Sequence, residues 1–238
     1  MYQLVYPTFP ACLRHSDAVH HPKTITSLGV LHNHVATDAV TAVHRYLLSV
    51  FRKKRLLNTE ARAQYITGLF RSDDDHPIIW REYVEGNIQN HPEISGYKTT
   101  RRGIFQLDPI LETLLGYYSS SGIKEDPPTE DPGPGNRPLG ILALATAAVE
   151  RAYKMYATGD FIESKQRFDA EFYNPRTARY MDYIANDLGE KQWDSIFGAL
   201  SAFSKQTKKE EAVQNGAPEG PQERVPLPLS DPPSPCNN

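Results

Sequence analysis

Hydrophobic residues recur at steps of three and four positions through most of the middle of the chain, which is the spacing of one buried helical face. The most apolar segment lies between Pro138 and Gly159. Because proline suits the first helical position and glycine the left-handed residue beyond the last turn, these residues predict a helix over 139–158. Its broad apolar face comprises Ile141, Leu144, Ala145, Ala148, Val149, Ala152, Tyr153 and Tyr156, and its narrow polar stripe comprises Ala143, Ala147, Glu150, Arg151, Lys154 and Thr158. Other helices must surround a helix this apolar for it to be stable.

Capping residues and apolar faces predict further helices on both sides of this one. They begin near Val35, at Thr59 (ending near Ser72), at Asp75 with Pro77 in its first turn, at Asp108-Pro109, at Asn174-Pro175 (ending at Gly189), and around Trp193 (ending near Lys205). The expected inward positions include Trp80, Tyr83, Val84 and Ile88 of the third helix, Phe161 and Phe168, and Ala178, Met181, Ile184, Ala185 and Leu188 of the helix after Asn174. Residues 90–106 are expected to form a loop, and the one candidate strand is 25–32.

This pattern predicts an all-α fold, a single globular array of about six to eight helices around the Leu/Ala-rich helix 139–158. Residues 1–23 are expected to be a loose N-terminal arm, and 24–204 the helical domain. Residues 119–137 form an acidic, proline-rich spacer whose composition predicts disorder. Residues 205–238 are predicted to be a disordered, proline-rich tail.

Composition narrows the class of protein without defining an activity. The chain has 238 residues, a formal net charge of −3 and only two cysteines, which disfavours a disulfide framework and gives no general attraction to nucleic acid or anionic membrane. The N-terminal residues lack the features of a signal peptide, and the longest apolar run, 139–149, is too short to span a bilayer. We therefore expect an intracellular protein, cytoplasmic or nuclear, that is neither secreted nor membrane-spanning and has no membrane partner.

Two stretches of the second half resemble a known family. The first is the run 142–152, followed by Tyr156, Thr158 and Gly159 at the end of the predicted helix. The second is the segment 168–173, which leads to Tyr180. The first resembles the central helix, and the second the following segment, of a domain of unknown function from mushroom-forming basidiomycete fungi. The similarity in layout extends over about 29–203, and the acidic spacer before Pro138 departs from it. The resemblance implies an intracellular all-helical domain without an assigned activity, and it supplies no catalytic residue.

Two short clusters have the chemistry of metal ligands. His32 and His34, with Asp38 one turn further on, are imidazoles near a carboxylate, as zinc or iron sites require. The alternative is that both histidines face water at a helix entry. The run 73–75 of three aspartates is compatible with magnesium, or with capping the third helix. We assign no metal ligand and expect no cofactor.

Two basic clusters and the tail carry the remaining candidate chemistry. The basic residues are Arg52, Lys53, Lys54, Arg55, Lys98, Arg101 and Arg102. They are compatible with nuclear import or polyanion binding, or with a solvated helix end that complements the macrodipole. The extended stretch 225–235 suits docking into an aromatic groove or phosphorylation at Ser230 or Ser234, and the alternative is a disordered tail without a partner.

These observations favour a non-catalytic protein-interaction module whose partner is another protein. The first alternative is a nuclear, nucleic-acid-associated factor that uses the basic clusters 52–55 and 98–102. The second alternative is an enzyme whose site is assembled from distant helices; no catalytic residue is assigned. The sequence does not define an oligomeric state.

Overall fold

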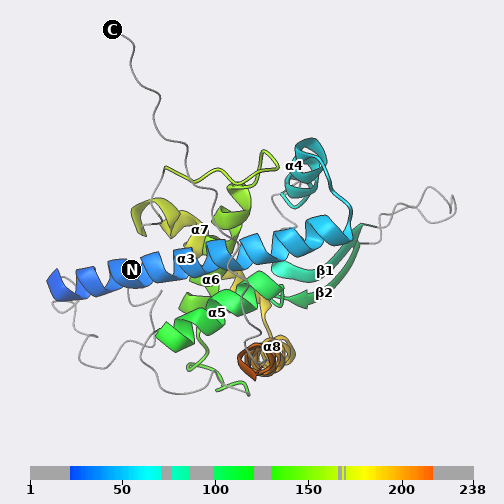
Figure 1. Ribbon diagram of the computed structural model, residues 1–238. Coiled ribbons are helices and arrows are strands. Elements are labelled where there is room, and N and C mark those ends of the chain that lie inside the picture. The colour runs from blue at the N-terminus through cyan, green and yellow to red at the C-terminus, as the bar shows by residue number, and fades with distance from the viewer. Residues whose placement is uncertain are drawn as a thin grey trace, which may run out of the picture.

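The computed structural model describes residues 22–70, 77–85, 99–120, 130–165, 168 and 170–216. Six α-helices and one antiparallel hairpin lie in these ranges, so the predicted all-α class is confirmed in broad terms (Figure 1). The elements are α3 (Pro22–Lys53), α4 (Thr59–Gly68), the 3₁₀ turn η2 (Pro77–Ile79), β1 (Trp80–Glu85), β2 (Thr99–Ile104), α5 (Asp108–Ser120), α6 (Leu139–Lys154), α7 (Ala170–Asp187) and α8 (Glu190–Gly216). Within the described part of the chain, no helix is long and apolar enough to cross a bilayer.

Helix α6 is the centre of the fold, as predicted. Thirteen of its sixteen residues are buried, because α3, α5 and α7 pack around it. The predicted polar stripe is wrong in part, since Ala143, Ala147 and Glu150 are buried as well. The helix ends at Lys154 rather than 158, and turns continue from there to Gly159, whose φ of 92° confirms the predicted left-handed residue.

An ionic cluster around a buried carboxylate explains why Glu150 does not face water. Its carboxylate accepts hydrogen bonds from Lys154 Nζ at 2.5 Å and from the Tyr180 hydroxyl at 2.9 Å, and Arg176 Nη1 lies 3.2 Å away. Because Tyr180 and Arg176 belong to α7, the cluster fixes α7 against α6. Burial, followed by the nearby Glu150 charge, raises the pKa of Tyr180 well above its usual range.

The region 77–104 differs from its prediction. The expected third helix is wrong over 77–85, and the expected loop 90–106 is wrong over 99–104: η2 leads into β1, which pairs antiparallel with β2 in the register Trp80↔Ile104 and Glu82↔Arg102. Residues 86–98 lie outside the described ranges. The run of Trp, Tyr and Val in β1 suits a strand, and so short an apolar segment fits either a helix or a strand by spacing alone. Ile88 lies outside the described residues.

Other boundaries shift for identifiable reasons. Helix α3 begins at Pro22, so the candidate strand 25–32 is wrong and the helix starts before Val35. Asn58, not Thr59, caps α4, because its side-chain oxygen accepts a hydrogen bond from the Ala61 N–H at 2.7 Å. Helix α4 ends at Gly68, before the predicted Ser72.

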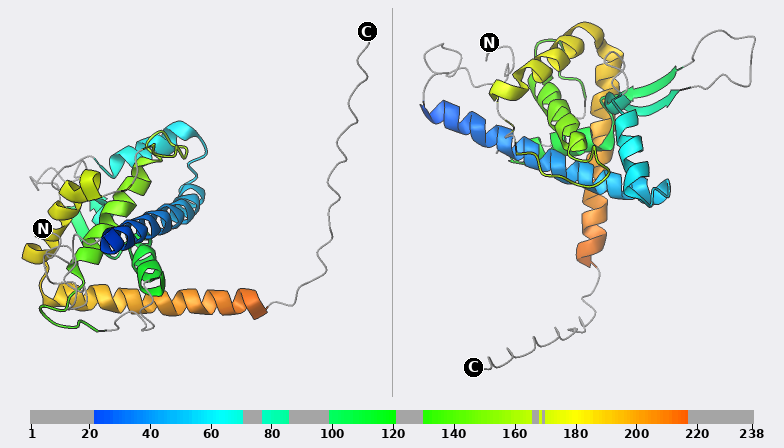
Figure 2. Two further views of the ribbon diagram at one scale, coloured as in Figure 1. Left: turned by 90° about the vertical axis from the view of Figure 1, so that its left-hand side faces the viewer. Right: turned by 90° about the horizontal axis from the view of Figure 1, so that it is seen from above.

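The last two helices are both longer than predicted. Helix α7 begins at Ala170, so Pro175 lies inside it rather than at its start. Tyr180 and Ile184 are buried as part of its inner face, whereas Ala178 and Ala185, both predicted inward, are exposed. Helix α8 continues past Lys205 to Gly216 because residues 205–214 are mostly strong helix formers. Figure 2 shows its C-terminal half extending beyond the packed body.

Part of the acidic spacer is also ordered. Arg137 donates to both carboxylate oxygens of Asp131, with Nε at 3.0 Å from each and Nη2 at 2.5 Å from Oδ2. Its guanidinium also lies over the Trp193 ring of α8, 5.6 Å from the centroid. The expected disorder is therefore wrong for residues 130–137: the bidentate pair closes this segment on itself, and the Arg137–Trp193 contact holds it against α8. Residues 121–129 lie outside the described ranges.

Candidate interaction surface

The first basic cluster forms the exposed C-terminal end of α3. Arg52, Lys53, Lys54 and Arg55 are all exposed. Arg55 N–H bonds to the Arg52 carbonyl at 3.2 Å and Leu56 N–H bonds to the Phe51 carbonyl at 2.9 Å. These two hydrogen bonds form a Schellman motif, which places Arg55 at the left-handed position with a φ of 55°. Glycine is the usual residue at that position.

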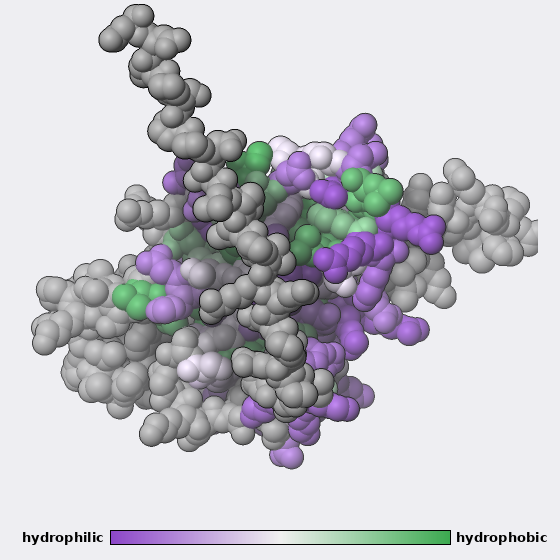
Figure 3. Space-filling view, viewed as in Figure 1, coloured by the Kyte–Doolittle hydropathy of each residue, from purple (hydrophilic) through white to green (hydrophobic). Residues whose placement is uncertain are grey.

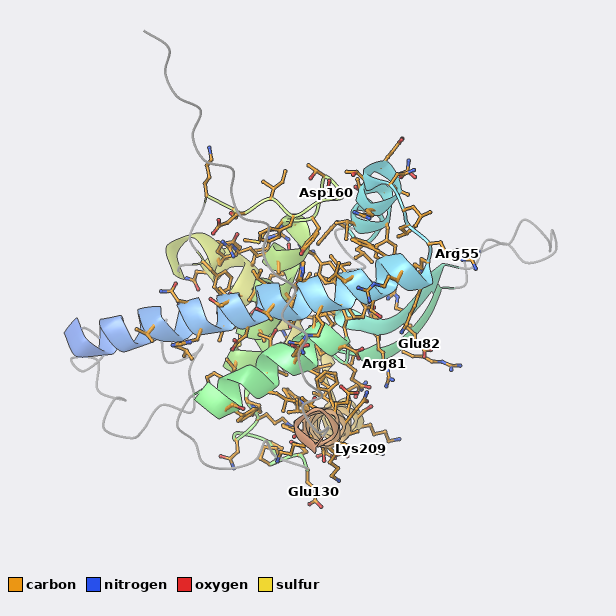
Figure 4. The ribbon with its side chains drawn as sticks, viewed as in Figure 1. Arg55, Arg81, Glu82, Glu130, Asp160 and Lys209 are labelled. Atoms are coloured by element: carbon orange, nitrogen blue, oxygen red, sulfur yellow. The ribbon has the colours of Figure 1, made fainter. Side chains whose placement is uncertain are left out.

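Helix α4 packs Ile66 into the core and Tyr65 against Phe51, and polar contacts also hold it beside this end of α3. Arg62 Nε donates to the Leu56 carbonyl at 3.0 Å, and its Nη1 lies 3.2 Å from Asp160 Oδ1. The Thr59 hydroxyl donates to the other Asp160 oxygen at 3.1 Å. Figure 4 shows Asp160 beside α4, on the segment that follows α6. The start of α4 and the segment after α6 are thus joined by Asp160.

Three large hydrophobic side chains are exposed around this joint. Leu57 is 84% exposed, Phe161 46% and Ile162 57%, and we call these three residues the junction patch. Five large hydrophobic residues are exposed in the described part of the chain, so more than half of them lie here. Phe161 contacts the ring of Tyr156, whose hydroxyl is hydrogen-bonded to His44 of α3. Figure 3 shows hydrophobic surface beside strongly hydrophilic surface over the α3–α4 junction.

The second basic cluster is only partly within the described residues. Arg101 and Arg102 lie exposed on β2, and Lys98 lies outside the described ranges. The Arg101 guanidinium is 5.9 Å from the Trp80 ring centroid, and Arg102 pairs in register with Glu82. Figure 4 places Arg81 and Glu82 of the hairpin at the same end of the molecule as Arg55. The structure therefore brings the first cluster and the described part of the second, Arg101 and Arg102, to one end, where Glu82 of the hairpin also lies.

An open groove of about 1140 Å³ runs between α3, β1, α5 and α8, and Lys53 and Arg81 line part of it. Its walls also carry Asp38, Glu112 and Glu210. Burial raises the pKa of the Asp38 and Glu112 carboxyls, and Arg45, 3.1 Å from Glu112, only partly opposes the effect on Glu112. The lining has charges of both signs and does not form a continuous positive face.

The structure separates His32 from the other two candidate metal ligands, His34 and Asp38, which interact with each other electrostatically. His32 is buried, with its ring edge-on to Phe168, 6.2 Å between centroids, whereas His34 faces solvent. The hypothesis that His32, His34 and Asp38 form one metal site is therefore wrong. Among the described residues no three His, Cys, Asp or Glu side chains are grouped to hold a metal ion. The run 73–75, Ser230, Ser234 and the stretch 225–235 lie outside those residues.

Sequence reasoning missed the junction patch. Phe161 was expected to be packed and is exposed, while Phe168 is buried as expected. Leu57 follows four charged residues at a helix end and belongs to no helical face, which is the only sequence signal for it. The contacts that bring α4 beside the segment after α6 join residues about a hundred positions apart, so the sequence does not indicate that these segments meet.

Comparison with known protein families, curated proteins and solved structures finds no match to this chain. The resemblance to a fungal domain of unknown function stays a prediction.

Proposed function

We propose that this protein is a non-catalytic protein-interaction module that binds its partner through the junction patch. Single exposed hydrophobic residues are ordinary on protein surfaces, whereas several gathered at one place mark interaction sites. Leu57 and Phe161 come from segments distant in sequence, and Asp160 links those segments through Thr59 and Arg62. This gathering of exposed hydrophobic residues at a fixed joint is the observation that carries the proposal.

The framework beneath the patch supports a preformed surface. Gly159 packs so tightly against the start of α4 that an added Cβ would lie 2.0 Å from the Thr59 carbonyl oxygen. Arg62 also stacks its guanidinium over Phe51, 5.2 Å from the centroid. A surface held in its binding geometry loses less conformational entropy when a partner docks.

A nucleic-acid-associated factor is the second candidate, because basic residues from α3 and the hairpin lie at one end of the molecule. Lys53 and Arg81 line the same groove. Glu82, which pairs with Arg102 in the hairpin, and Glu112 interrupt the positive charge there. A steep loss of oligonucleotide affinity with rising salt would favour this candidate over the protein partner.

The test compares partners captured by variants of the full chain in its native cell. The triple variant L57S/F161S/I162S removes the patch, and V30S is the matched control because Val30, on α3, is 50% exposed and outside the patch. We expect mass spectrometry to show partners that wild type and V30S share and the triple variant loses. Identical partner sets for all three proteins, with circular dichroism showing each folded, would contradict the proposal.

A further inference from the structure

We infer that the partner of the junction patch is an acidic protein segment that carries hydrophobic anchors. This inference rests on the proposed function and adds the chemistry of the partner. Arg52, Lys53, Lys54 and Arg55, which we call the basic cluster, immediately precede Leu56 and Leu57. A segment that places an apolar side chain on Leu57 therefore brings its neighbouring residues within a few ångströms of these cations.

The cations of the basic cluster are available to a partner. All four are exposed, and none of them forms an ion pair with any other residue that the structure describes. Lys54 lies over the Tyr65 ring at 5.4 Å, a contact that leaves its charge at the surface. Positive charge stabilises the helix macrodipole only when it lies within the last turn of α3. The basic cluster continues to Arg55, which lies beyond the helix end, so the macrodipole does not account for all of it.

The carboxylates nearest the patch do not cancel this charge. Asp160 is already paired with Arg62, so it adds little net negative potential. The other acidic residues beside the patch in sequence are Glu60, in the first turn of α4, and the exposed Glu163, which follows Ile162; together they are fewer than the four cations of the basic cluster. The surface around the patch therefore remains positive, and complementary charge is what selects a partner and speeds its association.

The backbone conformation of Arg55 also supports a binding role for its side chain. A non-glycine residue in the left-handed region costs free energy, and a Schellman motif gains most from glycine at that position. The chain has arginine there, with a φ of 55°, directly beside the patch. Strain of this kind is concentrated at functional positions, where a side chain is needed despite its cost.

A protein segment fits better than an anionic membrane. Insertion of Phe161 and Ile162 into acyl chains would take the neighbouring Asp160 carboxylate, whose side chain is 62% exposed, toward a negatively charged surface of low polarity. A peptide has backbone N–H groups that can hydrogen-bond that carboxylate. We therefore treat lipid binding as an outcome that overturns the inference.

The experiment selects short random peptides from a display library on the immobilised full chain. We expect the enriched peptides to contain about twice the Asp and Glu of the unselected library, together with aromatic or aliphatic residues. The affinity of the best synthetic peptide should fall about tenfold in R52A/K53A/K54A/R55A, and also when NaCl is raised from about 50 to about 300 mM. The control variant K191A/K205A/K208A/K209A removes four exposed lysines of α8, away from the patch, and should change affinity less than about twofold.

Three results would overturn the inference. These are enrichment of neutral or basic peptides or of none, equal affinity for wild type and the quadruple basic-cluster variant, and patch-dependent binding to phosphatidylcholine vesicles with about 30% phosphatidylserine. If captured cellular partners still depend on Leu57, Phe161 and Ile162, the proposed function stands and only the acidic partner is wrong. If those partners do not depend on the patch, the proposed function itself fails.

Discussion

Arg55 occupies a backbone conformation that glycine adopts without strain. Its φ of 55° lies in the left-handed region, and its N–H is one of the two donors that close the end of α3. Arg55→Gly should therefore raise the free energy of unfolding by about 0.5–1 kcal/mol, measured by urea denaturation. Arg55→Ala removes the same charge but keeps a Cβ, so it should give no such gain. A destabilised Arg55→Gly variant would show that the arginine side chain outweighs the strain.

A second prediction at the scale of single residues concerns Tyr180, whose hydroxyl donates a hydrogen bond to the buried Glu150 carboxylate at 2.9 Å. Tyr180→Phe leaves that carboxylate with one donor fewer and should cost about 1.5–3 kcal/mol of unfolding free energy. Tyr65→Phe is the matched control, since it keeps the ring against Phe51 and should change stability by less than about 0.5 kcal/mol. Equal losses in both variants would mean that the Glu150 cluster does not stabilise the α6–α7 contact.

At the scale of elements, the joint between α4 and the segment after α6 depends on Gly159. Its φ is 92°, and an added Cβ would meet the Thr59 carbonyl oxygen at 2.0 Å. Gly159→Ala should cost at least about 2 kcal/mol and weaken partner binding, because the patch residues on the two segments would separate. Gly133→Ala is a control at another positive φ, 84°, where an added Cβ has no neighbour within 4 Å. This variant should lose some stability through backbone strain but keep its partner binding. Hydrogen exchange of α4 amides would report the loosening directly.

Elements whose signals are local were predictable from the sequence. The helix α6 was found because its apolar face and Gly159 lie within one segment, and α5 because Asp108 and Pro109 mark its start. The hairpin was missed because Trp80–Glu85 is short and becomes a strand only by pairing with Thr99–Ile104. The extent of α7 was missed because a proline after Asn174 predicts a helix start equally well when the helix begins one turn earlier.

Of the candidate surface, the sequence predicts the basic cluster but not the junction patch. Arg52 to Arg55 follow the apolar face of α3 and were expected to be exposed, as they are. Asp160, next to Phe161 in the sequence, contacts Thr59 and Arg62 of α4, and no local pattern encodes that contact. Glu150 was misplaced for the same reason, since Tyr180 and Arg176 reach it from another helix.

On the scale of the whole molecule, the pH dependence of stability comes from carboxylates that lie partly buried between packed elements. Asp38 of α3 and Glu112 of α5 lie in the groove between these helices, and burial raises the pKa of both. A cationic Arg137 instead holds the pKa of Asp131 below its usual range. Ionisation of Asp131 and ionisation of Glu112 therefore have opposite effects on the stability of the fold. Asp131 stabilises the fold above its unfolded pKa of 3.8 and loses that effect as the pH falls through its lowered folded value, whereas ionised Glu112 opposes folding.

Glu112→Gln tests this opposition. Because the folded protein holds the Glu112 proton more tightly than the unfolded chain does, the contribution of Glu112 to wild-type stability should fall as the pH rises from the unfolded value of 4.5 through the raised folded value. The glutamine variant lacks this loss, so urea denaturation should find it more stable than wild type at neutral pH and indistinguishable below 4.5. Arg45, 3.1 Å from Glu112, is largely exposed, and exposed ion pairs contribute little. If Glu112→Gln is instead less stable at neutral pH, the ion pair with Arg45 outweighs the cost of burying Glu112. The charge of Glu112 would then stabilise the α3–α5 contact.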